Sequence, residues 1–266
     1  MSLCKFVPPC GKCDICSILK RTEWANRILL ETIYSVNTIF ITLTYNDENL
    51  PKDGSVSPEH AVNFIKRLKY YHEKPLRYYI CGEYGEQGFR PHYHAVLFSP
   101  DPIEQSSIES AWTFGFIHIG ENSNNAVAQY VAGYITKKLN RDDLYKESIL
   151  GQRHKEFSRK SQGLGRDVVP DIINATAGHL PNGDVYKSIQ LEGRKIYLGK
   201  YVITKLRKTL LNETKEPLYT KEMRSLQFEK NYEEAKAKNV TISEINKQKR
   251  LNLTSKVNLF KKEKKL

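Results

Sequence analysis

The stretch Arg90-Pro91-His92-Tyr93-His94-Ala95-Val96-Leu97-Phe98 predicts a β-strand that carries chemistry. Successive side chains of a strand point to opposite faces of its sheet, so His92 and His94 lie side by side on one face. From Ala95 to Phe98 both faces are apolar, which favours a central strand covered on both sides. Two imidazoles placed in this way can share one metal ion; the alternative is a pair of ordinary core histidines.

A carboxylate for this site is expected from the preceding strand, residues 76–83. Residues 85–90 contain two glycines and are short enough to form a hairpin, which brings Glu83 near both histidines. Glu86 in the hairpin loop is the competing ligand. We prefer Glu83 because its face follows from the alternation of its strand. Ordinary surface charge is the alternative for both carboxylates.

Other segments show clear strand or helix periodicity. Residues 38–45 alternate in polarity and predict a strand. Ser57-Pro58 supplies an N-cap and a first-turn proline for a helix that reaches about residue 68. We further expect a helix with one basic side over residues 17–34, a strand over 115–119, a basic glycine-bearing loop over 155–166, a hairpin over 189–197 and a helix over 202–211.

A helix is also predicted from Ala126 to Leu139, where apolar residues with helical spacing fill one broad arc. Tyr130, Tyr134 and Lys137 gather on the flank of that arc, within about 60° by the 3.6-residue period. A pair of aromatic residues at this spacing is more often packing than chemistry. Beside a metal-binding strand, two phenols and an ammonium group become candidates for catalysis.

The composition points to a polyanionic partner. The chain has 266 residues, enough for a full core, and a formal net charge of +12. Nucleic acid is the leading candidate. We find no run of about 18 apolar residues and no charged-then-apolar leader, so we expect an intracellular protein that does not enter a membrane.

The first 16 residues hold four of the five cysteines, at Cys4, Cys10, Cys13 and Cys16. Their C-x5-C-x2-C-x2-C spacing suits thiolate ligands of a structural Zn2+ ion in a reducing compartment better than a disulfide framework. Loop cysteines without a metal, or a metal shared with a distant ligand, are the alternatives.

These parts imply phosphoryl transfer on DNA. A hard divalent cation held by two histidines and a carboxylate keeps coordination positions open and can polarise a phosphodiester oxygen. A tyrosine is then the available nucleophile. Its phenol is weak at neutral pH, with an ordinary pKa of about 10, and Lys137 would help to stabilise the developing charge. The product would be a 5′-phosphotyrosine, which a 3′-hydroxyl or a second tyrosine can resolve without ATP.

Three motifs resemble, in their order and spacing, those of the His-hydrophobic-His (HUH) rolling-circle initiators. They are Thr42-Leu43-Thr44-Tyr45, Pro91-His92-Tyr93-His94 and Tyr130-Val131-Ala132-Gly133-Tyr134-Ile135-Thr136-Lys137-Lys138. The paired tyrosines and the Cys-Gly-Lys-Cys-Asp-Ile-Cys opening resemble the replication initiators of microviruses, closest to the gokushovirus group. Ser158-Arg159-Lys160 with Gly163-Leu164-Gly165 is similar to a further stretch of that group.

The resemblance implies an α+β fold in which a central antiparallel sheet, a variant of the ferredoxin-like fold, is flanked by helices. It also implies Mg2+ or Mn2+ as the cofactor, held by His92, His94 and Glu83. The implied activity is that of a metal-dependent, site-specific DNA endonuclease and strand transferase. Such an enzyme nicks origin DNA at a single-stranded site, forms a covalent 5′-phosphotyrosine and rejoins single-stranded circles.

The resemblance also suggests roles for single residues. Family members often have a lysine three residues after each tyrosine, whereas Gly133 follows Tyr130 in this chain. We therefore expect Tyr134, accompanied by Lys137, to attack first and Tyr130 to act second. DNA contacts are expected from Lys138, Arg159, Lys160 and Arg90. A host replicative helicase and a single-strand-binding protein are expected partners, and the host cell cytoplasm is the expected location.

Three parts are expected in the chain. Residues 1–35 form a Cys-rich basic segment, and residues 36–215 form the HUH endonuclease domain with a C-terminal hairpin extension. Residues 216–266 form a basic tail, partly helical or disordered, because core-forming residues are scarce there.

Two other classes of function fit part of the pattern. Two histidines and a carboxylate also describe a non-haem Fe(II) oxygenase, which would need neither the tyrosine pair nor the high positive charge. A non-enzymatic basic nucleic-acid-binding protein with a structural zinc leaves the shared face of His92 and His94 unexplained.

Overall fold

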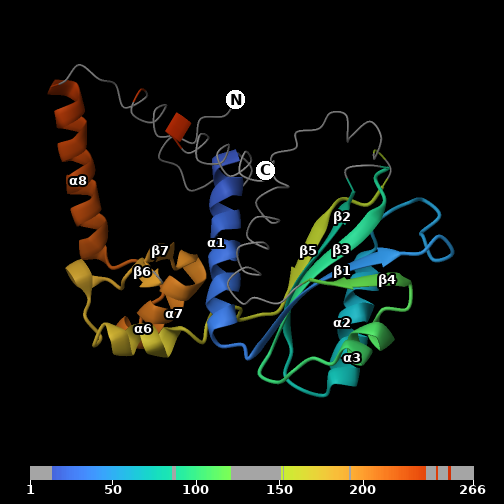
Figure 1. The fold of residues 1–266 in the computed structure, drawn as a ribbon. Coiled ribbons are helices and arrows are strands. Elements are labelled where there is room, and N and C mark those ends of the chain that lie inside the picture. Colours follow the sequence, from blue (N-terminus) through green and yellow to red (C-terminus); the bar gives the residue numbers. More distant parts are fainter. Residues whose placement is uncertain are drawn as a thin grey trace.

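The computed structural model describes residues 14–85, 88–120, 151, 153–191, 193–237, 244 and 251–252. They form an α+β fold, as expected, with a five-stranded antiparallel sheet between helices (Figure 1). Its strands are β1 (Asn37–Tyr45), β2 (Arg77–Tyr84), β3 (Pro91–Ser99), β4 (Gly115–Ile119) and β5 (Phe157–Lys160). The spatial order is β4-β1-β3-β2-β5.

The strand that contains the two histidines, β3, occupies the centre of the sheet. It pairs with β1 on one side and with β2 on the other. Eight of its nine residues are buried, and only His92 is half-buried. The prediction of a central, doubly covered strand from the apolar run after His94 is therefore confirmed.

Helices α2 (Pro58–His72) and α3 (Gln105–Ala111) cover one face of the sheet (Figure 1). The hydroxyl of Ser57 accepts a hydrogen bond from the amide of His60, and Pro58 stands in the first turn, so α2 begins where the sequence predicts. The main core lies between these helices and the sheet; it includes Ile41, Leu43, Tyr93, Ala95, Leu97, Phe64, Leu68, Ile108 and Trp112.

Helix α1 (Asp14–Ile33) packs against the opposite face of the sheet. Ile28 of α1 lies in a second cluster with Phe40, Tyr79, Val96, Phe98 and Leu164. The loop that follows β5 approaches α1 closely at Gly165, where an added Cβ would lie 2.9 Å from the carbonyl oxygen of Arg27 and φ is +73°. Glycine is needed there because it alone combines a left-handed backbone with so close an approach. The Gly165 amide donates a 2.6 Å hydrogen bond to Oε2 of Glu31.

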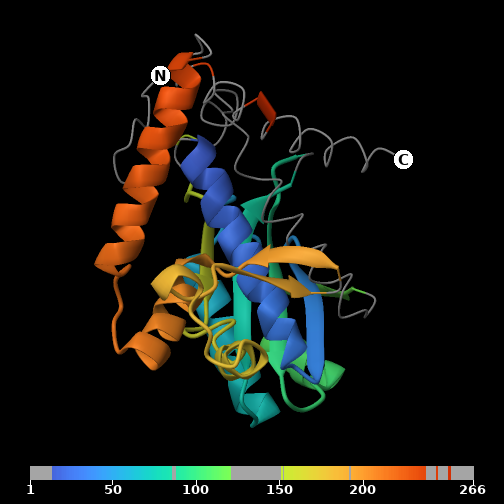
Figure 2. The same cartoon turned by 90° about the vertical axis from the view of Figure 1, so that its left-hand side faces the viewer.

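A third cluster joins α1 to the C-terminal part of the described chain. It involves Leu30 of α1 and apolar residues around α6 (Val169–Ala175) and α7 (Gly199–Leu211). Between these helices lie a short 3-10 helix (η2, Pro181–Gly183) and the hairpin β6 (Ser188–Leu191) and β7 (Arg194–Tyr197). The hairpin crosses α1, and α8 (Leu218–Ala237) extends beyond it (Figure 2).

One segment differs from its prediction. Residues 155–166 were expected to be a loop, but residues 157–160 form β5, which pairs with β2 at the edge of the sheet. Only four residues make up this strand, too few to establish an alternating pattern. Phe157 packs against the main core, whereas Ser158 and Lys160 lie on the face of α1.

Candidate metal centre

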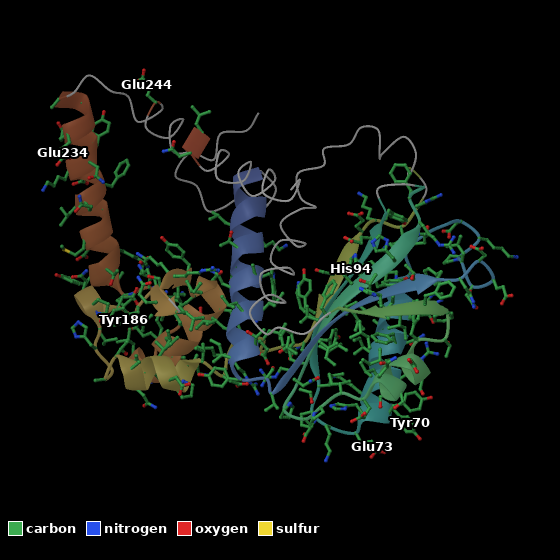
Figure 3. The ribbon with its side chains drawn as sticks, viewed as in Figure 1. Tyr70, Glu73, His94, Tyr186, Glu234 and Glu244 are labelled. Atoms are coloured by element: carbon green, nitrogen blue, oxygen red, sulfur yellow. The ribbon has the colours of Figure 1, made fainter. Side chains whose placement is uncertain are left out.

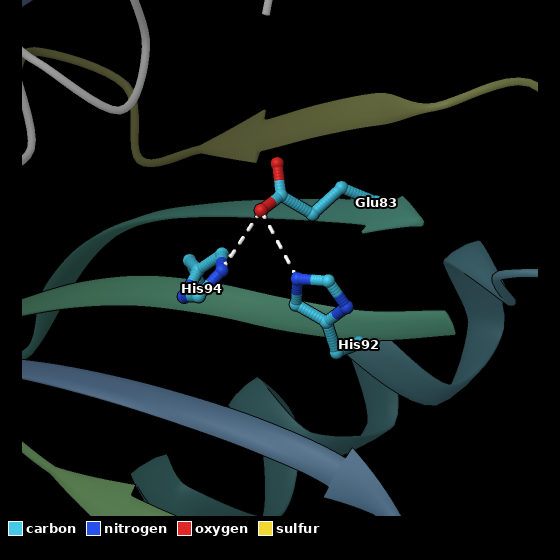
Figure 4. A group of neighbouring side chains, drawn as sticks. All are labelled: Glu83, His92 and His94. Atoms are coloured by element: carbon cyan, nitrogen blue, oxygen red, sulfur yellow. Dashed lines mark hydrogen bonds and ion pairs between the residues drawn. The ribbon is translucent and has the colours of Figure 1, made fainter. Parts of the chain in front are cut away.

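Strand register brings three predicted ligands together on the face of the sheet that α1 only partly covers. Glu83 of β2 pairs directly with His92 of β3, and His94 is the next residue of β3 on the same face. The hairpin between β2 and β3 therefore does what the sequence suggested, and Glu83 reaches both rings (Figure 4). Figure 3 shows His94 on the side of the sheet turned towards α1.

The carboxylate stands between the two imidazoles. Its Oε1 lies 3.1 Å from Nε2 of His92 and 2.8 Å from Nε2 of His94. One ligand atom from each of the three residues lies within 4.8 Å of the others. Side-chain exposure is 3% for Glu83, 7% for His94 and 16% for His92, so the group is open to solvent chiefly at His92.

The second nitrogen of each ring is held by the protein. Nδ1 of His92 donates to the carbonyl oxygen of Arg90, 3.1 Å away, and Nδ1 of His94 pairs with the hydroxyl of Thr42 at 2.9 Å. Phe40 stacks on the ring of His94, with centroids 5.6 Å apart and planes at 13°. These contacts orient both Nε2 atoms towards Glu83, which is the usual arrangement around metal-ligating histidines.

The donor set fits a divalent cation. Two imidazole nitrogens and one carboxylate oxygen supply three ligands and leave the remaining coordination positions free for water or substrate. Without a cation, the same atoms form a buried ion pair between Glu83 and a protonated histidine. The convergence of both Nε2 atoms on one oxygen favours the metal site, since an ion pair needs only one of the two rings.

Sequence reasoning missed Thr42 and Phe40. Both lie on the same face of the strand 38–45 as Thr44, which the alternation of that strand already indicated. What the sequence lacked was the register. Only the pairing of Thr42 with His94 shows that the hydroxyl meets the imidazole rather than another part of β3.

Several predicted residues lie outside the described part of the chain. They are the catalytic candidates Tyr130, Tyr134 and Lys137, the competing ligand Glu86, Lys138 of the expected DNA contacts, and Cys4, Cys10 and Cys13. Cys16 belongs to α1, but its side chain is not among those described. The roles of these residues stay predictions.

The other expected DNA contacts occupy different surroundings. Arg90 donates to the carbonyl oxygen of Tyr45 at 2.9 Å and pairs with Asp47 at 2.7 Å, close to the start of β3. Arg159 is exposed on β5. The ammonium group of Lys160 lies 4.2 Å from the ring centroid of Trp24.

Comparison with known proteins identifies relatives among phage replication proteins. Residues 38–139 match the family model of the replication-associated protein ORF2 type. The chain is 35% identical over 181 residues to replication-associated protein ORF2 of Spiroplasma virus 4, an overlap of 59% of this chain and 55% of that protein. It is 34% identical over 160 residues to replication-associated protein VP4 of Bdellovibrio phage phiMH2K, covering 52% and 50% of the two chains. With replication-associated protein ORF4 of Chlamydia phage 1 it shares 26% identity over 186 residues, 61% of this chain and 46% of that one.

These matches confirm the resemblance to phage replication proteins that the motifs predicted. The chain spans about half the length of the curated relatives it matches. No solved structure matches it. None of the described helices combines the length and the apolar composition that crossing a membrane requires.

Proposed function

We propose that this relative of phage replication-associated proteins initiates rolling-circle replication by cutting one DNA strand and holding its 5′ end on a tyrosine. The observation that carries the proposal is the convergence of Nε2 of His92 and Nε2 of His94 on Oε1 of Glu83. This triad lies inside the segment that matches the replication-associated family model. The proposed partner is DNA, and the proposed place of action is the cytoplasm of the host cell.

Glu83, His92 and His94 would hold Mg2+ or Mn2+, which supplies polarisation of a phosphodiester oxygen. The protein's own part is to fix the two rings, through Thr42 and the carbonyl oxygen of Arg90, so that their Nε2 atoms remain on one side. The buried carboxylate contributes the negative charge that a cation needs in this half-buried place.

The nucleophile we propose is Tyr134. Its phenol oxygen would attack the phosphorus, the bond from phosphorus to the 3′ oxygen would break, and the 3′ oxygen would leave as a hydroxyl after it takes up a proton. Lys137, one helical turn further in the predicted helix, would stabilise the charge that develops. Attack by a 3′-hydroxyl on the phosphotyrosine would then restore the phenol and close the strand. Tyr130 would serve as the second nucleophile in strand transfer.

Three further elements complete the proposal. Cys4, Cys10, Cys13 and Cys16 would hold a structural Zn2+ ion. A host replicative helicase and a single-strand-binding protein would act on the strand that nicking releases. The basic tail beyond residue 216 would add affinity for phosphates without reading sequence.

A covalent-capture experiment tests the proposal. The protein is incubated with Mn2+ and a single-stranded DNA library with a random centre and a label at the 3′ end, because the 5′-phosphotyrosine retains the 3′ fragment. We expect a labelled protein band that survives denaturation, and sequencing of the retained DNA gives the cleavage site. The band should disappear with EDTA and in Glu83→Gln.

The matched control is His118→Ala. His118 is an exposed histidine that pairs with Thr42 from the β4 side, outside the triad, so its removal should leave adduct formation unchanged. Absence of any adduct from the wild-type protein with Mn2+ contradicts the proposed chemistry, as does full adduct yield from Glu83→Gln.

A further inference from the structure

A row of alternating cations and aromatic rings crosses from β5 over α1 to α7. Lys160 lies over the ring of Trp24, and the guanidinium of Arg27 lies over the same ring, each 4.2 Å from its centroid. Arg27 is also 4.2 Å from the ring centroid of Tyr201, and Lys205 is 5.8 Å from it on the far side of the row. We call these five residues the cation–ring ladder.

The ladder begins on the same face of the sheet as the metal centre. Lys160 pairs with Tyr79 across β5 and β2, so both side chains point to the face that also carries Glu83. Trp24 stands against Tyr79, with ring centroids 6.0 Å apart. Tyr79 and Glu83 are four residues apart on β2, about 13 Å at 3.3 Å per residue. A few nucleotides of extended DNA span that distance.

Positive charges gather at this end of the ladder. Burial lowers the pKa of Lys160, and the neighbouring charges of Lys20, Arg27 and Arg159 lower it further. Among the described residues no carboxylate forms an ion pair with Lys160, Lys20 or Arg159. Like charges held together in this way cost free energy that a bound anion would offset.

Arg27 has a different place in the ladder. It is 7% exposed, its Nε donates to the carbonyl oxygen of Leu164 at 2.9 Å, and it lies against two rings. It therefore holds Trp24 and Tyr201 in position rather than meeting a ligand directly. Lys160 is half-buried and Lys205 is exposed, so these two ammonium groups remain within reach of a phosphate.

The rings do not offer free faces for bases. Cations lie over both Trp24 and Tyr201, whereas proteins that stack bases keep aromatic faces open to them. The ladder therefore has the features of a site for the DNA backbone. Backbone contacts position a strand without selecting its sequence.

We propose that the cation–ring ladder is a phosphate-binding track for single-stranded DNA, which guides the strand along the face of the sheet to and from the metal centre. The inference deepens the proposed function, because it supplies the path of the strand that the triad would cut. Lys160 and Lys205 bind phosphates, and Trp24, Arg27 and Tyr201 fix the geometry of the track.

Binding of a fluorescein-labelled single strand of about 20 thymidines, measured by anisotropy over a range of KCl concentrations, tests the track. EDTA is present throughout, so cleavage does not contribute. Each phosphate contact of a single strand contributes about 0.7 to the slope of log affinity against log salt. We expect Lys160→Gln and Lys205→Gln each to lower the slope by about this amount, and Lys160→Arg to preserve it.

Lys69→Gln is the matched control. Lys69 also lies over a tyrosine, 5.6 Å from the ring centroid of Tyr78, but Tyr78 packs against the core on the opposite face of the sheet. This variant should bind like the wild type. An unchanged slope in Lys160→Gln overturns the inference, as does an equal loss in Lys69→Gln or Lys160→Arg. A loss seen only with a duplex of the same length overturns it as well.

The failure of the track and the failure of the proposed chemistry give different results. If the triad does not cleave DNA, no adduct forms but binding still depends on Lys160. If the track is wrong, adducts form while the salt slope of Lys160→Gln equals that of the wild type.

Discussion

Thr42 and His94 face each other across β1 and β3, and Oγ1 of the threonine lies 2.9 Å from Nδ1 of the imidazole. The other nitrogen of the ring, Nε2, is 2.8 Å from Oε1 of Glu83. The hydroxyl thus holds the ring in the orientation that presents Nε2 to the metal centre. Thr42 is a positioning residue, since it acts only through His94.

The first prediction concerns this hydroxyl. Thr42→Val keeps the shape of the side chain and removes its hydrogen bond, and loss of such a contact typically weakens metal affinity about 10- to 100-fold. Titration calorimetry with Mn2+ measures the effect, and Thr42→Ser should restore affinity.

Thr44→Val serves as its control. Thr44 lies on the same strand face, opposite His92, and its hydroxyl donates to the carbonyl oxygen of Phe116 instead. Wild-type affinity in Thr42→Val, or an equal loss in Thr44→Val, would show that the hydroxyl does not orient the ligand.

The second prediction concerns the ligands themselves. His92→Ala and His94→Ala should abolish nicking and leave the fold largely intact. Saturation with Mn2+ at about 100 times its dissociation constant stabilises a protein by about 2.7 kcal/mol. We expect thermal unfolding of the wild type and of His118→Ala to shift upward with Mn2+, and that of both ligand variants to stay in place. Metal-dependent cleavage by the doubly substituted protein would contradict the site.

The third prediction separates the two tyrosines. Tyr134→Phe should abolish the first cleavage, whereas Tyr130→Phe should allow one nick and impair the strand transfer that ends a replication round. Phenylalanine keeps the ring and removes only the nucleophile, so the change tests chemistry. Adduct formation on one cleavable oligonucleotide, followed by addition of an acceptor strand, measures both steps.

Two results would refute this asymmetry. If Tyr130→Phe is the variant that forms no adduct, the roles of the two tyrosines are reversed. If both variants keep the full adduct yield, the tyrosines are interchangeable at initiation.

The fourth prediction concerns stability. Arg207 of α7 makes two hydrogen bonds to Asp184, of 2.8 and 2.6 Å, and Asp184 is 2% exposed. Burial acts to raise the pKa of Asp184, but the hydrogen bonds from Arg207 and from the amide of Val185 outweigh it, so the pKa lies below its ordinary value of 3.8. Asp184→Asn, which leaves a buried guanidinium unpaired, should lower the free energy of unfolding by about 3–5 kcal/mol at neutral pH.

The pH dependence follows from the lowered pKa. The ion pair stabilises the folded protein fully at pH values above about 4, and this contribution is lost as the pH falls through the pKa of the folded state. Urea unfolding at pH 7 and pH 3 should therefore show a smaller difference between wild type and Asp184→Asn at pH 3. Lys187→Met is the control, because Lys187 is half exposed and only 3.6 Å from Asp184. A difference that does not shrink at pH 3 would contradict the assignment.

Local patterns were sufficient to predict the central strand and its ligands. The alternation of residues 76–83 and 91–98 placed Glu83, His92 and His94 on one face, because a hairpin fixes which strands are neighbours. The role of Thr42 could not be predicted, since β1 reaches β3 only through a long connection and its register depends on the whole sheet. The ladder could not be predicted either. Trp24, Lys160 and Tyr201 are far apart in the sequence, and only packing of α1 against both β5 and α7 brings them together.

Tyr93 stands between the two histidines but points into the core, where its hydroxyl lies 2.6 Å from that of Tyr45 and donates to the carbonyl oxygen of Ser57. A slip of β3 by one residue would exchange the two faces. It would drive both imidazoles in among apolar side chains and expose the phenol where the ligands now stand. Because that error disrupts the core as much as the site, folding of the core selects the register that assembles the metal centre.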